Sequence, residues 1–436
     1  MISVIGLGKL GLPFALTLAS KGNEVYGIDL NTTLIKKLQN GSSNLYEPQI
    51  ANHLTQYRNT IHFSTNVVEA ITNTNITFII VPTLSEPDGS FSLKYIHMAI
   101  KMIAPVLKKK KSKHTIVITS TVSPLSMEKI GKSLKIQTGK GIGNDIGLCY
   151  SPEFIALGSV VHNLINPDLI LIGESDSDSG KQLLKLRKSI CENNPTIVRT
   201  NWINAELTKI SLNSYITMKI SFANMIARVC ERIPGADVDI ITQAIGSDKR
   251  VGNKFLKGGL GFGGPCFPRD NVAISTFIHG IDLDAEIPSA VQAFNLSQLS
   301  EIFSFIKKHI GKKTLIGILG LSYKPETDVI DESQGILLAK KFITEGYNVK
   351  AYDPAAMSNA KIILPDVGFT SSAQECIDVS EVIVITTPWP QFIDLNWLTT
   401  KNKNSRKIVI DCWRLLDKSK LKSEYISYIP LGSKPI

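Results

Sequence analysis

One cysteine of the sequence lies where its thiol could act as a nucleophile. Cys266 belongs to the segment 258–270, GGLGFGGPCFPRD, in which glycine and proline favour a loop over a core element. Small neighbours would let a substrate reach the sulfur, and Arg269 with other basic groups could favour the thiolate, the reactive form. The residues alone leave a catalytic role and a packing role equally open. The remaining cysteines are interpreted as buried packing residues: Cys149, Cys191, Cys230, Cys376 and Cys412.

A glycine-rich turn near the start of the chain could bind a phosphate. Gly6, Gly8 and Gly11 form a GxGxxG pattern directly after an apolar strand pattern and before a helical pattern, Leu12–Ser20. In that context the glycines permit a tight turn, close approach of a pyrophosphate and close packing of helix on strand. The next strand pattern ends at Asp29, 18 residues after Gly11. A carboxylate there can accept from the ribose 2′-OH of NAD and would repel the 2′-phosphate of NADP, so we predict NAD. The alternative is a glycine turn beside an exposed aspartate.

Short apolar runs between helical segments would position this turn. In the first half of the chain we expect strands at Ser3–Ile5, Glu24–Ile28, Ile76–Val81, Thr115–Thr119 and Leu169–Ile172. This alternation is typical of a parallel, doubly wound sheet. From Asn204 to Arg232 there is neither glycine nor proline, and apolar residues recur at helical spacing, which predicts one long connecting helix.

A second alternating block follows the helical middle of the chain. We expect strands at Thr314–Leu319, Asn348–Tyr352, Val382–Thr386 and Lys407–Asp411, and a helix at Ser333–Thr344. The predicted fold class is therefore α/β, with two Rossmann-like doubly wound parallel-sheet domains joined by a long central helix and a helical middle domain.

Composition and length narrow the classes of protein. The 436 residues are 43% hydrophobic and 20% charged, which indicates a globular protein of two or three domains. Apolar runs are far shorter than the roughly 20 residues of a membrane span. No export signal follows Met1, so we expect a cytoplasmic protein with no membrane partner. The cysteines show neither CxxC pairs nor a zinc-type histidine spacing, so we expect no metal.

The net charge of +10 does not by itself indicate nucleic acid. The lysines are scattered, and anionic small molecules would suit a basic chain equally well. The concentrated run Lys108–Lys111 follows an apolar helical pattern and is interpreted as a solvated helix end. We therefore expect no nucleic-acid partner.

The chain resembles the nucleotide-sugar dehydrogenase family over essentially all of its length. The similarity lies in separated motifs: GLGKLGLPFA at the start, Ser120-Thr121-Val122, Ser151-Pro152-Glu153-Phe154, Glu206 with Lys209 and Asn213, RVGNKFLK at 250–257, GFGGPCFPRD, Tyr323-Lys324-Pro325 and Tyr352-Asp353-Pro354. The resemblance implies a four-electron oxidation of the 6-CH2OH of a UDP-sugar by two NAD and one water. UDP-glucose is the first expectation, and UDP-N-acetylhexosamines (GlcNAc or ManNAc) stay open.

The resemblance also implies roles for the residues of these motifs. The Cys266 thiolate would attack the aldehyde formed by the first oxidation, and Lys209 and Asn213 would stabilise the negative charge that develops. Their i, i+4 spacing places both on one helix face. Lys209, or Asp270 through a water, would take the hydroxyl proton. Glu153 would activate the water that hydrolyses the thioester, with Thr121 holding that water or the cofactor. The alternatives without a catalytic role are that Glu206 and Lys209 form an exposed pair on a solvated helix, and that Glu153 is a charge at a helix N-terminus.

Binding residues follow from the same resemblance. For the cofactor we expect Gly6, Gly8, Lys9, Leu10, Gly11, Asp29, Pro82, Thr83 and Thr121. For the substrate we expect Glu153, Phe154, Lys209, Asn213, Arg250, Phe255, Leu256, Lys257, Gly263, Lys324 and Arg414. Lys324 and Arg414 would contact the nucleotide diphosphate, although both could also be surface cations. Arg250 would reach the substrate of a partner subunit, which implies a homodimer through the long helix.

The resemblance also divides the chain into three domains. Residues 1–198 would be the NAD-binding Rossmann domain, 199–300 a helical dimerisation domain with the Cys266 loop, and 301–436 the nucleotide-sugar-binding domain. The chain departs from the family pattern at two places. Asp331 replaces an arginine that helps hold the cofactor in many relatives. Residues 155–158 read IALG, where UDP-glucose enzymes have a charged run. The rival functions are a two-electron hydroxyacid dehydrogenase and a non-catalytic NAD-binding protein.

Overall fold

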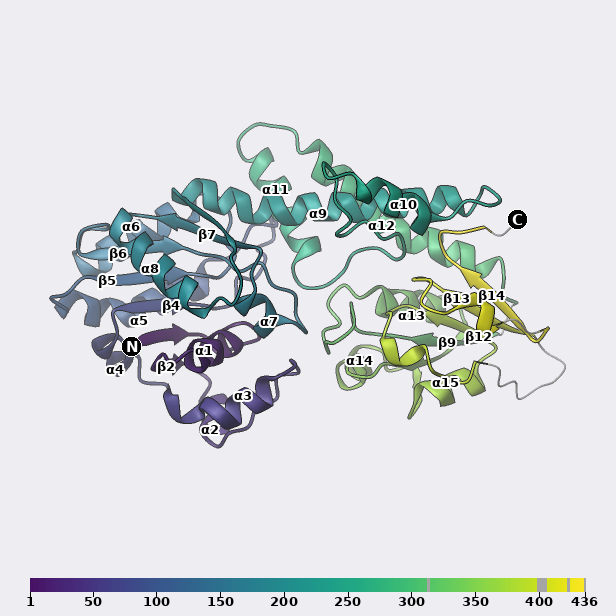
Figure 1. Cartoon of the computed structure of the whole chain (residues 1–436), viewed down its shortest axis with the longest axis horizontal. Coiled ribbons are helices and arrows are strands. Elements are labelled where there is room, and N and C mark those ends of the chain that lie inside the picture. The colour runs from purple at the N-terminus through teal and green to yellow at the C-terminus, as the bar shows by residue number, and fades with distance from the viewer. Residues whose placement is uncertain (312–313, 398–405, 422–423, 435–436) are drawn as a thin grey trace. The chain divides into compact units, whose positions relative to one another are not determined.

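The computed structural model describes residues 1–311, 314–397, 406–421 and 424–434 of the chain (Figure 1). These residues form two compact units, Met1–Ser211 and Leu212–Ile436. Each unit is built around one sheet, and the predicted pair of Rossmann-like α/β domains with helices between them is confirmed.

The first unit contains an eight-stranded sheet in the order β3-β2-β1-β4-β5-β6-β7-β8. Its strands are β1 Ile2–Ile5, β2 Val25–Ile28, β3 Ile61–Ser64, β4 Ile76–Ile79, β5 His114–Ile118, β6 Ile146–Tyr150, β7 Leu169–Glu174 and β8 Thr196–Thr200. β1 lies between β2 and β4, so that Ile5 pairs with both Ile28 and Ile79. All neighbours are parallel except β6 and β7, which differ from the all-parallel expectation. Because β6 and β7 run in opposite directions, the segment between them does not have to cross back to the opposite end of the sheet, as a connection between parallel neighbours does.

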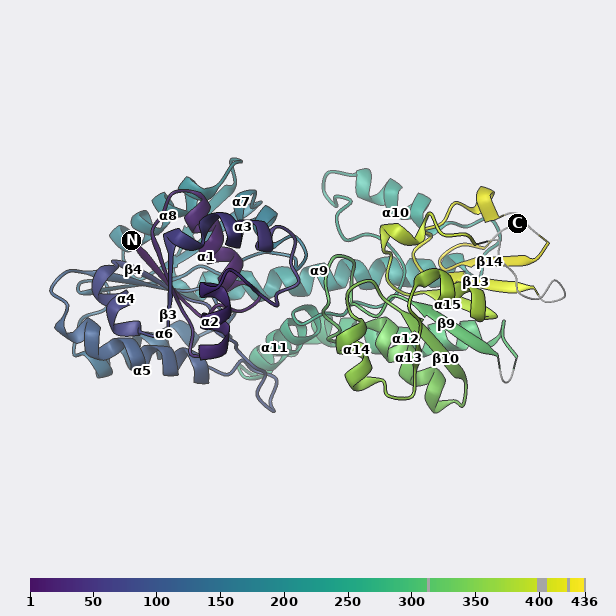
Figure 2. The same ribbon diagram turned by 90° about the horizontal axis from the view of Figure 1, so that it is seen from below.

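Helices cover both faces of this sheet, as expected of a doubly wound fold. They are α1 Gly11–Ser20, α2 Thr32–Gln39, α3 Ile50–Tyr57, α4 Val67–Asn73, α5 Lys94–Lys109, α6 Ser126–Thr138, α7 Val160–Ile165 and α8 Ser177–Ile190. Figure 2 shows α1, α3, α7 and α8 on one face and α4, α5 and α6 on the other. Two apolar clusters fill the two interfaces, one around Phe14 and Leu183 and one around Ile100 and Ile130.

A single long helix, α9 (Trp202–Cys230), contributes residues to both units. It confirms the connecting helix predicted from Asn204 to Arg232. The second unit continues with α10 Val238–Ser247, α11 Phe267–His279 and α12 Glu286–Lys307.

The second unit carries a six-stranded, fully parallel sheet in the order β11-β10-β9-β12-β13-β14. Its elements are β9 Leu315–Leu319, α13 Gln334–Thr344, β10 Asn348–Tyr352, α14 Met357–Ile363, β11 Gly368–Phe369, α15 Ala373–Val379, β12 Val382–Ile385, β13 Lys407–Asp411 and β14 Ile426–Pro430. Phe303 and Ile306 of α12 pack with Phe342 of α13 in one apolar cluster, and Cys376 and Ile377 of α15 belong to another.

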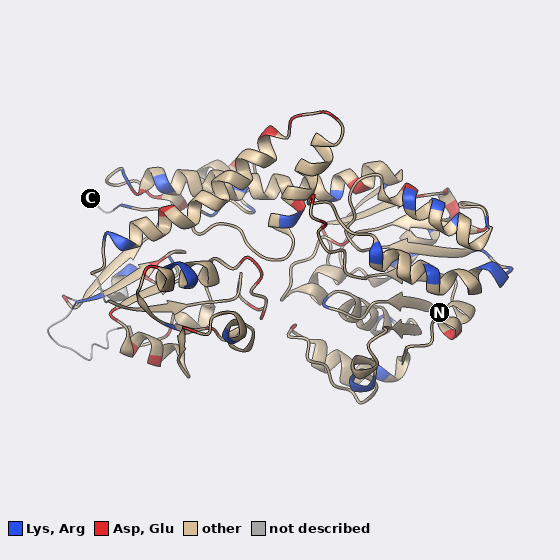
Figure 3. Cartoon of the chain, turned by 180° about the vertical axis from the view of Figure 1, so that it is seen from behind, with Lys and Arg blue, Asp and Glu red and all other residues tan. Residues whose placement is uncertain are grey.

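Charged residues are distributed over both units. Figure 3 shows Lys and Arg on many helices and loops, interspersed with Asp and Glu. The run Lys108–Lys111 ends α5 as predicted, but Lys110 is half-buried and donates to the Ile71 carbonyl at 2.7 Å. Among the described helices, none combines the length and the hydropathy that crossing a membrane requires.

Candidate active site

The turn after β1 has the geometry of a dinucleotide-binding loop. Gly6 has a φ of +93°, and a Cβ added there would collide with the Ile80 carbonyl. A Cβ on Gly11 would collide with the Gly6 carbonyl, because α1 begins there against the loop. At Gly8, in contrast, no atom lies within 4 Å of an added Cβ, so the backbone faces open space. The residues therefore fit a pyrophosphate at the N-terminus of α1.

Asp29 follows the end of β2 and faces the same loop. Its Oδ2 accepts a hydrogen bond from the Leu7 N–H at 2.9 Å, and its Oδ1 accepts from the Asn31 N–H at 2.9 Å. Lys9 is exposed and Leu10 half-buried beside it. The carboxylate is thus held beside the glycine loop, and its contact with the ribose of NAD stays a prediction.

The loops after β4 and β5 are tied together by hydroxyl groups. The Ser120 Oγ accepts from the Val81 N–H at 2.9 Å, and the Thr83 Oγ1 donates to the Thr121 carbonyl at 2.8 Å. Because β1, β4 and β5 are parallel, these loops and the glycine loop lie at the same edge of the sheet. The structure therefore brings Thr83 and Thr121 to the edge that carries the predicted cofactor site, where Pro82 is exposed.

Glu206 of α9 holds the start of α6. Its Oε2 accepts from the Leu125 N–H at 2.9 Å and its Oε1 from the Met127 N–H at 2.7 Å. Leu125 has a left-handed backbone (φ +68°) and provides no side-chain cap for α6. Glu206 is 1% exposed, so the alternative of an exposed Glu206–Lys209 pair is wrong. Glu206 fixes the loop that follows Thr121 instead.

Glu206 predicts a dependence of stability on pH. Burial raises the pKa of its carboxyl from 4.5 to about 7, although hydrogen bonds from the N–H groups of Met127 and Leu125 oppose this. Between these two values the folded chain binds more protons than the unfolded chain, so the free energy of unfolding falls as pH rises, by up to about 3 kcal/mol. Glu206→Gln should flatten this slope in urea denaturation at pH 5 and pH 8. The exposed Glu69→Gln should leave it unchanged, and a wild-type slope in Glu206→Gln would contradict the assignment.

Glu153 lies in the segment after β6 and is paired with an arginine that the sequence did not single out. The distance from Arg187 Nη1 to Glu153 Oε1 is 2.6 Å, and that from Nη2 to Oε2 is 2.8 Å. Both residues are buried, and Glu153 does not start a helix, so the helix-terminus alternative is wrong. Arg187 could have been noticed, because it stands between Leu183 and Ile190 on the apolar face of α8.

Lys209 is buried against the same segment. Its Nζ donates to the main-chain carbonyl of Glu153 at 2.9 Å and lies 4.8 Å from the centre of the Phe154 ring. The structure thus brings Glu153, Phe154, Arg187 and Lys209 together within the first unit. Asn213 follows Lys209 by one turn of α9.

In the second unit Asn213 contacts the helix that follows the cysteine loop. Its Nδ2 donates to the Asp270 Oδ2 at 2.6 Å, and the neighbouring Ser214 Oγ donates to the Asn271 Oδ1 at 2.9 Å. All four side chains are buried. Asn213 and Asp270, predicted separately as catalytic, therefore form one buried polar contact between α9 and α11.

Cys266 is exposed and stands at the N-cap of α11. Its carbonyl accepts from the Asp270 N–H at 2.8 Å. Free N–H groups at a helix N-terminus favour a thiolate. The other cysteines are buried except Cys191, which is half-buried.

The glycines before Cys266 serve packing more than access to the sulfur. The loop is irregular, as predicted, but much of it is buried. Added Cβ atoms would crowd the Trp413 ring at Gly259, the Glu332 carbonyl at Gly263 and the Tyr323 ring at Gly264, whose φ is +84°. The Gly264 N–H also donates to the Asp331 carbonyl at 2.9 Å, so the departure at Asp331 lies next to the cysteine loop.

The segment predicted to line the substrate presents both buried and exposed side chains. Leu256 is buried, whereas Lys257 is exposed. Phe255 has a φ of +62° and its ring meets the Phe267 ring edge-on at 6.1 Å. Arg250 is 89% exposed and pairs with Asp248 at 2.6 Å. Lys324 is half-buried.

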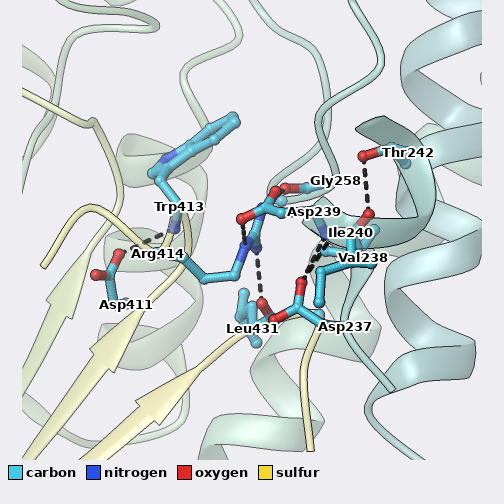
Figure 4. Close-up of polar contacts among 12 residues, drawn as sticks. Asp237, Val238, Asp239, Ile240, Thr242, Gly258, Asp411, Trp413, Arg414 and Leu431 are labelled. Carbon is cyan, nitrogen blue, oxygen red and sulfur yellow. Dashed lines mark hydrogen bonds and ion pairs between the residues drawn. The ribbon is translucent and has the colours of Figure 1, made fainter. Parts of the chain in front are cut away.

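Arg414 makes contacts that differ from the predicted one with a diphosphate. Its Nε and Nη2 donate to the two carboxylate oxygens of Asp239 at 2.6 and 2.9 Å, and Nη1 donates to the Leu431 carbonyl at 2.7 Å. Nη2 also donates to the carbonyl of Gly258, the first residue of the cysteine loop, at 2.7 Å. Figure 4 shows the guanidinium enclosed by these groups. In this structure Arg414 joins α10, the end of β14 and the cysteine loop.

Removing this guanidinium should destabilise the second unit. We expect Arg414→Ala to lower its free energy of unfolding by about 2 kcal/mol, because the carbonyls of Gly258 and Leu431 lose their donor, while the half-exposed carboxylate of Asp239 is partly resolvated. The measurement is the midpoint of urea denaturation. Arg232→Ala removes an exposed arginine at 3.8 Å from Glu301 and should change it little. A wild-type midpoint for Arg414→Ala would contradict this structural role, and diphosphate binding by Arg414 stays a prediction in either case.

Comparison with known proteins gives consistent matches along the whole chain. Three profiles of the UDP-glucose/GDP-mannose dehydrogenase family match: the NAD binding domain over residues 1–191, the central domain over 203–297 and the UDP binding domain over 317–418. A UDP-glucose 6-dehydrogenase of Rickettsia bellii is 32% identical over 441 residues, with 99% of each chain covered.

Solved structures give the same result. A UDP-glucose dehydrogenase from Pyrobaculum islandicum superposes with a TM-score of 0.89 at 30% identity, covering 99% of this chain and 97% of that one. A UDP-D-ManNAc dehydrogenase from Pyrococcus horikoshii superposes with a TM-score of 0.84 at 25% identity, covering 100% of both chains.

Proposed function

This chain belongs to the UDP-glucose/GDP-mannose dehydrogenase family and is an NAD-dependent UDP-sugar 6-dehydrogenase, and on that premise we propose that Cys266 holds the sugar covalently between its two oxidations. The observation that carries the proposal is an exposed thiol at the N-terminus of α11, within the stretch that matches the family's central domain. A thiol in this position can form a thiohemiacetal with an aldehyde and thereby allow a second oxidation at one site.

In the proposed reaction, each step uses a residue of the motifs described above. Lys209, or Asp270 through a water, takes the proton of the 6-hydroxyl in the first oxidation. The Cys266 thiolate then forms a bond with the aldehyde carbon, and the oxygen of this thiohemiacetal is stabilised by Lys209 and Asn213. NAD, held by the glycine loop and Asp29, would supply the hydride acceptor, one NAD for each of the two oxidations. The second oxidation leaves a thioester at Cys266, which one water hydrolyses with Glu153 as the activating carboxylate.

UDP-glucose is the substrate that we propose first. Support comes from relatives of about 30% identity that are named UDP-glucose dehydrogenases. A UDP-N-acetylhexosamine is the second candidate, because residues 155–158 lack the charges of UDP-glucose enzymes, and Ile155 and Leu157 instead pack against the apolar cluster of the first unit. The relative named for UDP-D-ManNAc supports this second candidate at lower identity.

NADH absorbance with a panel of nucleotide sugars tests the substrate. The panel contains UDP-glucose, UDP-N-acetylglucosamine, UDP-N-acetylmannosamine and GDP-mannose. We expect kcat/KM for UDP-glucose to exceed that for the others by about 10²-fold or more, since a pocket shaped for a hydroxyl excludes a larger acetamido group. A higher value for an acetamido sugar would select the second candidate. No NADH with any of the four would contradict the proposed activity.

We also propose that the chain is cytoplasmic and has three domains, at 1–198, 199–300 and 301–436.

We further propose a homodimer formed through α9. Support for the homodimer comes from exposed apolar side chains of α9 at positions seven residues apart, Tyr215, Phe222 and Val229, which place an apolar stripe on one helix face. Light scattering after gel filtration should give twice the monomer mass, and Phe222→Asp should lower it. A monomeric wild-type protein would contradict this proposal.

A further inference from the structure

The buried partner of Glu153 calls for a functional explanation. Arg187 is 2% exposed and Glu153 is 8% exposed, and the guanidinium contacts both carboxylate oxygens of Glu153. Removing two charges from water costs several kcal/mol per ion, and apolar residues of similar volume often stabilise a fold as well as such a pair does. Stability alone therefore does not explain a bidentate ion pair at this place.

The surroundings of Arg187 leave its guanidinium little freedom. Its Cζ lies 5.3 Å from the centre of the Phe14 ring, which belongs to α1 directly after the glycine loop. A guanidinium held between an aromatic ring and a carboxylate is a rigid fork, which fixes the plane of that carboxylate.

A carboxylate held in this way can still bind a water. Each carboxylate oxygen has two lone pairs. Nη2 donates to one of those on Oε2, whereas Nη1 lies 2.6 Å from Oε1 as an ion pair without hydrogen-bond geometry, so both oxygens keep an acceptor site. The same residue also holds Lys209, because the Glu153 carbonyl accepts from the Lys209 Nζ at 2.9 Å. The position of residue 153 thus determines where its carboxylate and the lysine ammonium both lie.

We propose that Arg187 is a positioning residue for the hydrolysis step: it holds the Glu153 carboxylate in the orientation that aligns the attacking water. This inference rests on the proposed function. In the step concerned, the water oxygen forms a bond with the thioester carbon, the C–S bond breaks, and the Cys266 sulfur leaves as thiolate. The water protons pass through the Glu153 carboxylate to solvent, and no electrons are transferred.

Rapid-mixing measurements of NADH with UDP-glucose and saturating NAD test the proposal. For Arg187→Met we expect a burst of about two NADH per Cys266, at a rate close to that of the wild type, followed by steady turnover about 10²-fold slower than wild type. During the steady phase, mass spectrometry should find the uronyl thioester on Cys266. Added hydroxylamine, which attacks a thioester without an activating carboxylate, should accelerate this steady phase and leave the wild-type rate unchanged. The exposed Lys188→Met on the same helix is the matched control and should behave as wild type.

Two further variants keep the outcomes separate. Arg187→Lys restores one charged contact without the fork. It should show the same burst, followed by steady turnover about 10-fold slower than wild type. If Arg187→Met does not fold, Arg187→Lys tests the proposal in its place. Glu153→Gln should reproduce the burst. A burst in Glu153→Gln but in neither Arg187 variant would overturn the role of Arg187 and leave that of Glu153 intact. The same conclusion would follow if the Arg187 variants slowed the first and the later turnovers equally. Absence of a Cys266 adduct in every variant would refute the covalent mechanism itself.

Discussion

Cys266→Ser should lower the steady rate of uronate formation by at least about 10⁴-fold while NAD binding is retained. A serine hydroxyl at the start of α11 is a far weaker nucleophile than a thiolate, so the aldehyde formed by the first oxidation is not captured. The glycine loop and Asp29 belong to the first unit and Cys266 to the second, so the substitution leaves the groups that fit NAD unchanged. The measurements are uronate formation and the quenching of protein fluorescence by NAD.

The matched control for this variant is Cys191→Ser. Cys191 is the other cysteine that is not buried, and a serine hydroxyl can keep its hydrogen bond to the Arg187 carbonyl. Its kcat should stay within a factor of two or so of wild type. Uronate formation by Cys266→Ser at a rate near that of the wild type would rule out a covalent role for this thiol.

The second large effect is expected at Lys209. Lys209→Met should lower kcat by about 10³-fold, since it removes the cation proposed to stabilise the thiohemiacetal oxygen. Methionine can occupy the space beside the Phe154 ring, so the fold of this segment should survive. KM for the UDP-sugar should change much less than kcat, because the lost contact is made mainly in the transition state.

Steady-state kinetics on Lys209→Met and on Lys132→Met, an exposed lysine of α6, separate this effect from a general loss of charge. Lys132→Met should match wild type. If Lys209→Met raises KM and leaves kcat unchanged, the lysine contributes to substrate binding alone and the assigned role is incorrect.

The sequence predicted the interior of both sheets better than their edges. The strands with continuous apolar runs, such as β4 and β12, were predicted nearly to the residue. Most of the strands that were not predicted lie at sheet edges: β3 and β8 in the first sheet, and β11 and β14 in the second. An edge strand has a neighbour on one side only, and β8 is exposed or half-buried at every position, so it carries no apolar run.

Local chemistry was predictable where a motif defines its own geometry. The glycine loop has the close contacts at Gly6 and Gly11 and the open side at Gly8 that the pattern requires. Contacts between distant residues were not predictable from the pattern. Arg187 meets Glu153 across 34 positions, Glu206 meets Leu125 across 81, and Arg414 meets Asp239 across 175. Each is a charged residue that sequence spacing alone cannot assign to its partner.

The same difference between local motifs and distant contacts explains why the partners of Arg414 were not predicted. A diphosphate does require cationic donors, but so does a half-exposed aspartate that lies beside two main-chain carbonyls. The sequence identifies the donor and leaves the acceptor open. The structure supplies Asp239, Gly258 and Leu431 as acceptors within the second unit.

The ratio of NADH formed to UDP-sugar consumed tests the central claim most directly. The reaction is run to completion with limiting UDP-glucose, or with the best substrate of the panel, and the uronate is quantified in the same sample. Two successive oxidations at Cys266 predict two NADH and one uronate for each UDP-sugar. A ratio of one, with an aldehyde as the product, would contradict the four-electron mechanism.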